Sequence, residues 1–308
     1  MITSQHHRAL VVSATWTLLL LFLGSIVHAT GSSLACPDWP TCYGSMMPAM
    51  VGGVFWEHLH RLVAGGLILM WLLTGWLIRR ELAPASVLRG WVAGLVLLLV
   101  QAVFGGVTVL LRLPPAISTA HLTLAFLFLG LAVVLAVATS PHRTDPTGLS
   151  PSVRVALHHW GSTAAGLVLA QSVLGGLVRH LDAGLACPDL PLCLGQLVPP
   201  LEQPLVALHF LHRVTALVTG IVVIATALTV LRSPARGPLR RLAWSTILVL
   251  FFQIALGVAS VAAHLAVTPV SLHTLGAASL FVATVVLAAW GRLPSPPPSG
   301  EPAPMVVT

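Results

Sequence analysis

The sequence contains very few charged residues and no lysine. Only 7% of its 308 residues are charged, against roughly 25% in an average soluble domain, whereas 56% are hydrophobic. This balance is typical of a protein embedded in a membrane. The 15 basic residues are all arginines, mostly in short gaps between apolar runs and without interleaved aromatics, so we expect no nucleic-acid partner.

Long apolar runs occur eight times along the chain. A helix that crosses a bilayer needs about 20 mostly apolar residues. The sequence therefore predicts an all-α integral membrane protein with eight transmembrane helices, at residues 9–29, 56–78, 87–110, 118–138, 157–180, 205–231, 239–264 and 268–290. The first run lacks a convincing signal-peptide cleavage site, so we expect it to be retained. The Pro-rich residues 293–308 are predicted to be disordered.

Arginines are concentrated at one end of the predicted helices. Most lie in the N-terminal segment, the even-numbered loops and the C-terminal segment, whereas the odd-numbered loops carry Asp38, Asp182, Asp189 and Glu202. Because cytoplasmic loops are enriched in basic residues, we expect both termini to be cytoplasmic. The two cysteine-bearing loops would then lie on the outer face, where disulfides persist.

The four cysteines mark an internal duplication. "ACPDWPTCYG" at 35–44 returns as "ACPDLPLCLG" at 186–195, 151 residues further on. "EHLHR" at 57–61 returns as "HFLHR" at 209–213, 152 residues further on. Each half contains four predicted helices and so starts on the same side of the membrane. This pattern predicts two four-helix bundles in a parallel tandem repeat, residues 1–145 and 146–292.

Each half also carries two histidines at the same predicted depth, His60 and His121 in the first and His212 and His273 in the second. Ionisable residues within membrane helices usually mark a functional site. Two imidazoles from facing helices can ligate a haem iron from both sides. One buried histidine alone would more often bond a carbonyl, but four at matched spacing favour haem ligation. Copper or zinc would need further ligands.

A carboxyl group accompanies only one of these pairs. Glu57, His60 and Arg61 share one helix face, whereas the second half has His209 in place of Glu57. A carboxyl beside a haem could move protons, so the first half is the candidate for chemistry and the second for a permanent cofactor. Arg61 and Arg213 could bind haem propionates. The alternatives are an ion pair of Arg61 with Glu57 and snorkelling of Arg213.

The cysteines of each loop are close enough in sequence to form a local disulfide. We expect each pair to clamp its loop over the site. A redox relay and a shared four-cysteine zinc site are the alternatives, and the spacing is wide for zinc. His58 points about 100° away from His60 on the helix, so we expect no ligand role for it. Gln101 and Gln253, each followed at i+4 by a glycine, are predicted to serve helix packing.

Taken together, these residues resemble the haem A synthase family. The likeness covers nearly the whole chain: "GSSLACPDWPTC", "EHLHR", "HFLHR" and the single histidines of the fourth and eighth helices, in that order. The resemblance implies an oxidoreductase that converts haem O to haem A, by oxidising a porphyrin methyl group to a formyl group through oxygen-dependent hydroxylation. Haem A serves haem–copper terminal oxidases.

The resemblance also assigns roles to particular residues. It makes His212 and His273 the ligands of a bound haem b, His60 and His121 those of the substrate haem O, and Glu57 essential to the reaction. It implies the disulfides Cys36–Cys42 and Cys187–Cys193. Candidate partners are haem O synthase and subunits of haem–copper oxidases, and a homo-oligomer is left open.

Other functions fit part of this pattern. A di-haem electron-transfer cytochrome would also use two histidine pairs, but its haems would be expected to span the membrane. A thiol–disulfide oxidoreductase would leave the histidines unexplained, and a haem carrier would not need Glu57 in one half only. With no transit peptide apparent, we expect a multi-pass protein of the bacterial plasma membrane.

Overall fold

The computed structural model describes residues 4–141 and 149–292, and it is helical throughout, apart from loops and one short 3-10 turn. The helices are α1 (Gln5–Ala29), α2 (Gly52–Arg80), α3 (Ala85–Leu110), α4 (Pro115–Ala138), α5 (Pro151–His180), α6 (Pro204–Leu231), α7 (Gly237–Ala262) and α8 (Val267–Trp290). Each predicted segment coincides with one helix, and the largest difference at an end is six residues, at the start of α5. The predicted boundary between the halves and the predicted disordered tail lie outside the described residues.

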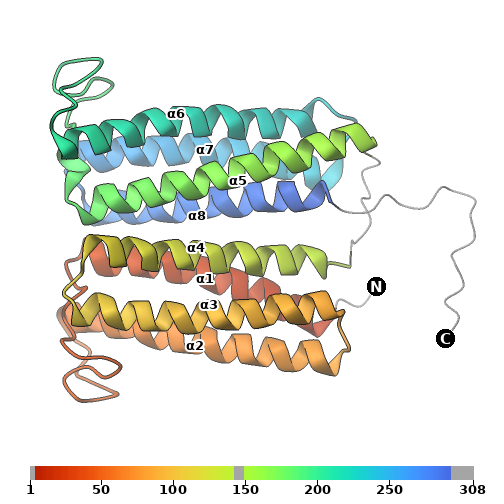
Figure 1. The fold of residues 1–308 in the computed structure, drawn as a ribbon, viewed down its shortest axis with the longest axis horizontal. Coiled ribbons are helices and arrows are strands. Elements are labelled where there is room, and N and C mark those ends of the chain that lie inside the picture. The colour runs from red at the N-terminus through yellow and green to blue at the C-terminus, as the bar shows by residue number, and fades with distance from the viewer. Residues whose placement is uncertain (1–3, 142–148, 293–308) are drawn as a thin grey trace, which may run out of the picture.

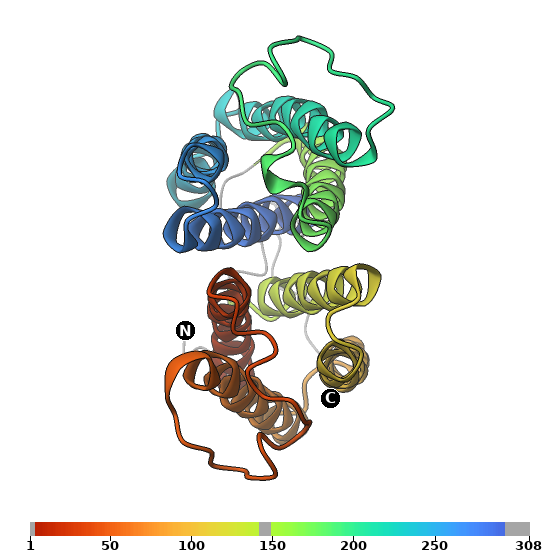
Figure 2. The ribbon, with the colours of Figure 1, turned by 90° about the vertical axis from the view of Figure 1, so that its left-hand side faces the viewer.

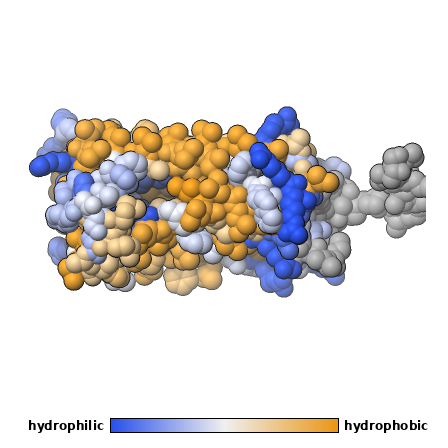
Figure 3. Space-filling view, turned by 90° about the horizontal axis from the view of Figure 1, so that it is seen from below, coloured by the Kyte–Doolittle hydropathy of each residue, from blue (hydrophilic) through white to orange (hydrophobic). Residues whose placement is uncertain are grey.

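All eight helices are long and apolar enough to cross a membrane. On the face seen in Figure 3, hydrophobic residues form a broad belt and polar residues gather toward the two ends. Large apolar side chains are exposed along this belt, among them Leu69, Trp76, Leu99, Leu217, Ile221, Phe251 and Phe252. Such a surface is stable in lipid and would be costly in water, so the chain is an integral membrane protein.

The helices form two groups of four, α1–α4 and α5–α8 (Figures 1 and 2). The groups meet where α1 and α4 pack against α5 and α8. An apolar core runs through this contact and includes the edge-to-face pair Phe126 and Phe281, with ring centroids 5.5 Å apart. Both long cysteine-bearing loops lie at one end of the molecule, here called the loop end, and the described chain ends lie at the other (Figure 1).

Close helix packing depends on glycines set opposite large rings. The indole of Trp71 on α2 donates to the carbonyl of Trp91 on α3 at 3.1 Å, and Trp91 donates back to the carbonyl of Trp71 at 2.8 Å. A Cβ atom at Gly94 or Gly75 would lie only 2.4 or 2.2 Å from these indoles. Glycine therefore makes room for two buried indoles, each with its N–H paired.

Candidate functional site

Each of the four histidines predicted as ligands packs against a glycine of a neighbouring helix. A Cβ atom at each of these glycines would lie 3.1 Å from Cε1 of the imidazole. The pairs are His60 with Gly24, His121 with Gly105, His212 with Gly175 and His273 with Gly257. The neighbouring backbone thus supports each ring closely and fixes its direction.

The two histidines of each group come from helices that are diagonal in the bundle. In the first group α2 carries His60 and α4 carries His121, and both helices pack on α1 and α3. His60 and His121 are near enough to interact electrostatically, as are His212 and His273. Each pair therefore reaches into the middle of a four-helix bundle from two corners, as bis-histidine haem ligation requires.

In the first group the imidazoles are held loosely by hydrogen bonds. Nδ1 of His60 and Nδ1 of His121 are buried and have no partner among the described residues. Nε2 of His121 lies 3.4 Å from Nε2 of Gln101, and the ring also faces the backbone carbonyl of Gln101. Buried nitrogens without partners are costly unless a ligand satisfies them, so this pair fits a group that arrives from outside.

In the second group both rings are oriented by hydrogen bonds. Nδ1–H of His273 donates to the backbone carbonyl of Gln253 at 3.1 Å, which leaves the lone pair on Nε2; this atom lies 3.4 Å from Nε2 of Gln253, as Nε2 of His121 does from Gln101. Nε2 of Gln171 lies 3.0 Å from Nδ1 of His212, and it also donates to the His212 carbonyl at 2.8 Å. Gln171 is itself fixed, because its Oε1 accepts a bond from Thr215 at 2.5 Å.

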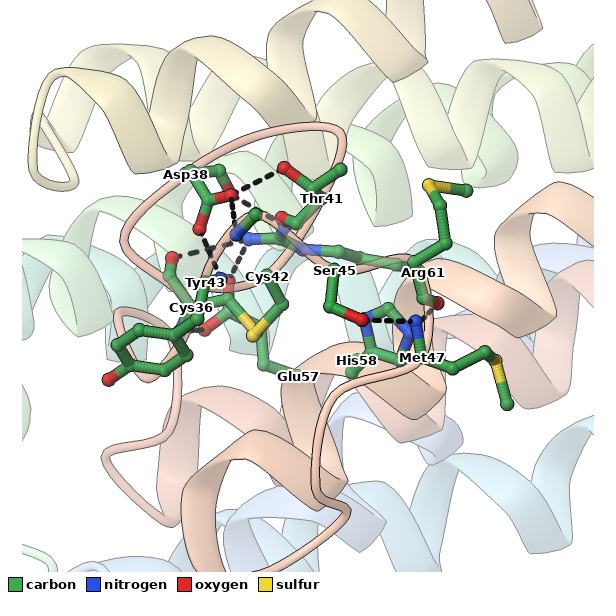
Figure 4. The surroundings of a disulfide bond; sticks show 12 residues. Cys36, Asp38, Thr41, Cys42, Tyr43, Ser45, Met47, Glu57, His58 and Arg61 are labelled. Carbon is green, nitrogen blue, oxygen red and sulfur yellow. Dashed lines mark hydrogen bonds and ion pairs between the residues drawn. A yellow bond between two sulfur atoms is a disulfide. The ribbon is translucent and has the colours of Figure 1, made fainter.

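Glu57 is attached to the first cysteine loop (Figure 4). The residue is 4% exposed; Oε2 accepts the backbone N–H of Cys36 at 2.8 Å, and Oε1 pairs with Nη2 of Arg61 at 2.5 Å. Nη1 of Arg61 donates to the carbonyls of Asp38 and Thr41, at 2.7 and 2.6 Å. The expected Glu57–Arg61 ion pair is therefore present, and Arg61 also clamps the loop.

The second loop has the same clamp. Nη1 of Arg213 donates to the carbonyls of Asp189 and Leu192, both at 2.9 Å, and Nη2 donates to that of Cys187. Nδ1 of His209, at the position of Glu57, lies 2.9 Å from the carbonyl of Ala183. Arg213 thus binds loop carbonyls and does not snorkel freely. Its predicted contact with a propionate, like that of Arg61, stays a prediction.

The cysteines pair within each loop, Cys36 with Cys42 and Cys187 with Cys193, with Cα atoms 4.8 and 4.7 Å apart. After each pair the chain reverses in a tight turn. In the first loop Tyr43 and Gly44 have φ of 52° and 72°, and Cys42 and Ser45 exchange backbone hydrogen bonds across the turn. Two successive positive φ values favour glycine, which explains Gly44.

Asp38 organises this turn from outside the membrane helices. Its carboxylate accepts hydrogen bonds from the Thr41 hydroxyl and from the backbone N–H groups of Gly44 at 2.8 Å and Tyr43 at 2.6 Å. These donors favour the charged form and hold the pKa of Asp38 below its usual value.

A polar cluster between the two helix groups was not predicted as a site. Arg179 of α5 donates to Oγ and O of Ser25 on α1, at 2.9 and 2.7 Å, and forms no ion pair within the described part of the chain. The rings of His28 and His180 lie beside it, 5.2 Å apart, and His180 contacts Thr119 at 3.0 Å. The sequence signal was Arg179, one of the few arginines near the loops that carry Asp38, Asp182, Asp189 and Glu202. Gln171, one polar residue in an apolar run, was also overlooked.

The fold and these side chains define an integral membrane protein with two intramembrane histidine pairs, one pair accompanied by a carboxylate. Comparison with known families agrees. The chain belongs to the COX15-CtaA family, the cytochrome oxidase assembly proteins, whose model matches residues 7–52 and 50–285.

Individual relatives extend over most of the chain. A protein named "Heme A synthase" from Shewanella oneidensis is 26% identical over 321 residues, 90% of this chain and 93% of the relative. One of the same name from Symbiobacterium thermophilum is 29% identical over 279 residues, 87% and 89% of the two chains. A third, from Alkalihalophilus pseudofirmus, is 28% identical over 209 residues, 66% and 69% of the two chains.

Proposed function

We propose that this protein is a haem A synthase, an oxidoreductase that converts haem O to haem A for the assembly of terminal oxidases. Membership of the COX15-CtaA family and the relatives' names support this activity. The observation that carries the proposal is the contrast between two otherwise matching histidine pairs. Only the first has a buried carboxylate, Glu57, beside it, and only there does each imidazole keep a buried Nδ1 without a partner.

Haem b is proposed for the second group, between His212 and His273. The glycines behind both rings and the hydrogen bonds from Gln171 and to Gln253 hold the imidazoles in one orientation. At His273 the donated Nδ1–H leaves the lone pair on Nε2, which suits a permanent ligand, whereas the His212 ring is held in place by the Gln171 amide and Gly175. Haem b bound there would supply an iron that changes its oxidation state by one electron.

Haem O is proposed as the substrate of the first group, between His60 and His121. Because Nδ1 of each ring has no hydrogen-bond partner among the described residues, hydrogen bonds restrain these rings less than those of the second group. This suits a ligand that must enter and leave. Glu57 is the proposed catalytic residue, because a buried carboxylate three residues before His60 on the same helix, held by Cys36 and Arg61, could take or give a proton in a haem O site there. A 100-fold or greater contribution is of the order that general acid–base groups supply.

The roles of the two halves, the orientation in the membrane and the partners are part of the same proposal. Residues 1–145 form the substrate half and 146–292 the cofactor half, in the bacterial plasma membrane with the cysteine loops outside. The arginine distribution supports that orientation. Haem O synthase and subunits of haem–copper oxidases are the proposed partners, because the synthase would supply haem O and the oxidase would take haem A.

The test is haem extraction and chromatography from aerobic membranes that contain a haem O source. The full-length protein should produce haem A, and Glu57→Gln should lower production about 100-fold or more while the tightly bound haem b stays. Haem b without any conversion of haem O, under a working electron supply, would instead support an electron-transfer cytochrome.

A further inference from the structure

His58 packs against the disulfide of the first loop. The side chain is 2% exposed, and one imidazole nitrogen and the two sulfur atoms of Cys36 and Cys42 lie within 4.8 Å of one another (Figure 4). Both cysteines are fully buried. A polar ring is therefore enclosed together with a disulfide, which offers it no hydrogen-bond donor.

The hydrogen bonds of His58 determine what its ring can accept. Nε2 lies 3.0 Å from the carbonyl oxygen of Met46, which can only accept, so Nε2 carries the proton. Nδ1 then has the lone pair, and it is buried with no partner among the described residues. A buried acceptor without a donor is unfavourable. A thiol in place of the disulfide would bring an S–H donor within 4.8 Å of an imidazole nitrogen of His58, and S–H can bond to such a nitrogen.

The second loop has a benzene ring in the same place. Phe210 occupies the position of His58 after 152 residues, and it packs against Cys187, Cys193 and Val206. The two loops share the arginine clamp and the buried cysteine pair, and they also differ where the N–H of Cys36 meets Glu57 and that of Cys187 meets His209. The side chain that packs against the disulfide thus differs between the two loops: it is an imidazole in the first and a phenyl ring in the second.

We propose that Cys36–Cys42 is a redox-active dithiol–disulfide pair, that His58 favours its reduced form, and that Cys187–Cys193 is a permanent clamp. The reductant is a dithiol, on a protein or a small molecule. Its thiolate attacks one sulfur and breaks the Cys36–Cys42 bond, and its second thiol then resolves the mixed disulfide. Two electrons and two protons pass to the pair, and the donor becomes a disulfide.

The pair is connected to the carboxylate of the proposed active site. The backbone N–H of Cys36 binds Glu57, and its carbonyl accepts from Arg61 at 3.4 Å. Reduction frees the loop to move between Cys36 and Cys42, so the redox state of the pair changes how firmly Glu57 is held. His58 acts here as a positioning residue, through the sulfur atoms.

The test is an equilibrium titration of the full-length, haem-containing protein with mixtures of reduced and oxidised dithiothreitol. Thiols are trapped with a maleimide, and peptide mass spectrometry gives the reduced fraction of each pair. Equilibrium is the readout because both pairs are buried and loop opening would limit the rates. The first pair should be half reduced at an about tenfold lower dithiol-to-disulfide ratio than the second, equivalent to about 30 mV.

Two reciprocal variants complete the test. His58→Phe should remove the tenfold difference, and Phe210→His should bring the second pair to the ratio of the first. Retained haem b absorbance shows that each variant is folded. Equal ratios for the two pairs in the unmodified protein, or no shift in either variant, would overturn the proposal. The readout needs neither haem O nor oxygen, so its outcome is separate from that of haem A synthesis.

Discussion

Glu57 and Cys36 are joined by a hydrogen bond of 2.8 Å, from the backbone N–H of the cysteine to Oε2 of the carboxylate. This bond connects a membrane helix to a loop at the surface. In the second group the backbone N–H of Cys187 lies 3.4 Å from Nδ1 of His209. The same loop-to-helix contact thus ends on a carboxylate in one group and on an imidazole in the other, and the predictions below test what depends on it.

The two histidine pairs should have separate roles in haem binding. His212→Ala removes a proposed ligand whose ring contacts Gln171, so we expect loss of the proposed haem b from the purified protein. His60→Ala should keep haem b and lose the conversion of haem O. Pyridine haemochrome content and optical spectra measure the first effect, and haem chromatography measures the second. Full haem b content in His212→Ala and His273→Ala would count against these ligands.

A change that leaves the ligands intact should have a similar effect. Gly257→Val places a side chain where a Cβ atom already lies 3.1 Å from Cε1 of His273. We expect the ring to be displaced and haem b to be bound more weakly, at an overpacking cost of about 1–3 kcal/mol. Gly166→Val is the matched control, because nothing lies within 4 Å of its Cβ position. Equal haem retention in the two variants would refute the support role.

Arg61 should matter more for activity than for haem b. Arg61→Met removes the bonds to the carbonyls of Asp38 and Thr41 and the ion pair with Glu57. We expect faster proteolysis of the first loop and an about 10-fold or greater loss of haem A formation, with haem b retained. Arg213→Met should expose the second loop in the same way. A first loop that stays protected in Arg61→Met, with weakened haem O binding, would favour the propionate role instead.

The first loop should lose order in acid. The pKa of Asp38 is lower in the folded protein than its ordinary value of 3.8, so the charged carboxylate stabilises the loop above about pH 4, and this contribution is lost as the pH falls through the lowered pKa. Hydrogen exchange at Tyr43 and Gly44, corrected for the intrinsic rate, should accelerate over that range. Asp38→Asn should show faster exchange already at pH 7; an unchanged rate would contradict the assignment.

The contact between α2 and α3 should be sensitive to one methyl group. Gly75→Ala would bring a Cβ atom within 2.2 Å of the Trp91 indole, and the backbone or the ring must move. We expect a loss of about 1–3 kcal/mol in stability, measured as a lower midpoint of thermal unfolding in detergent. Gly65→Ala, whose Cβ would have no neighbour within 4 Å, is the control and should leave the midpoint unchanged.

Much of the architecture followed from local features of the sequence. The eight helices could be counted because a helix that crosses a bilayer needs about 20 apolar residues and tolerates few charges within that stretch. The matched positions of His60, His121, His212 and His273 were visible because the spacing of motifs is preserved in both halves. The packing of these histidines against glycines was not visible in the sequence. Gly105 and Gly257 were expected only to bring helices together, whereas each also supports an imidazole.

The sequence by itself determined a membrane protein with eight helices, paired histidines and a carboxylate in one half. Only the tertiary structure decided which atoms these side chains meet. For Arg61 and Arg213 the sequence left propionate binding open beside an ion pair and snorkelling, and the folded loops bring backbone carbonyls to both. His58 was passed over because it turns away from His60, and its contact with Cys36 and Cys42 exists only once the loop folds back. Periodicity describes one helix at a time, and contacts between distant segments depend on how all of them pack together.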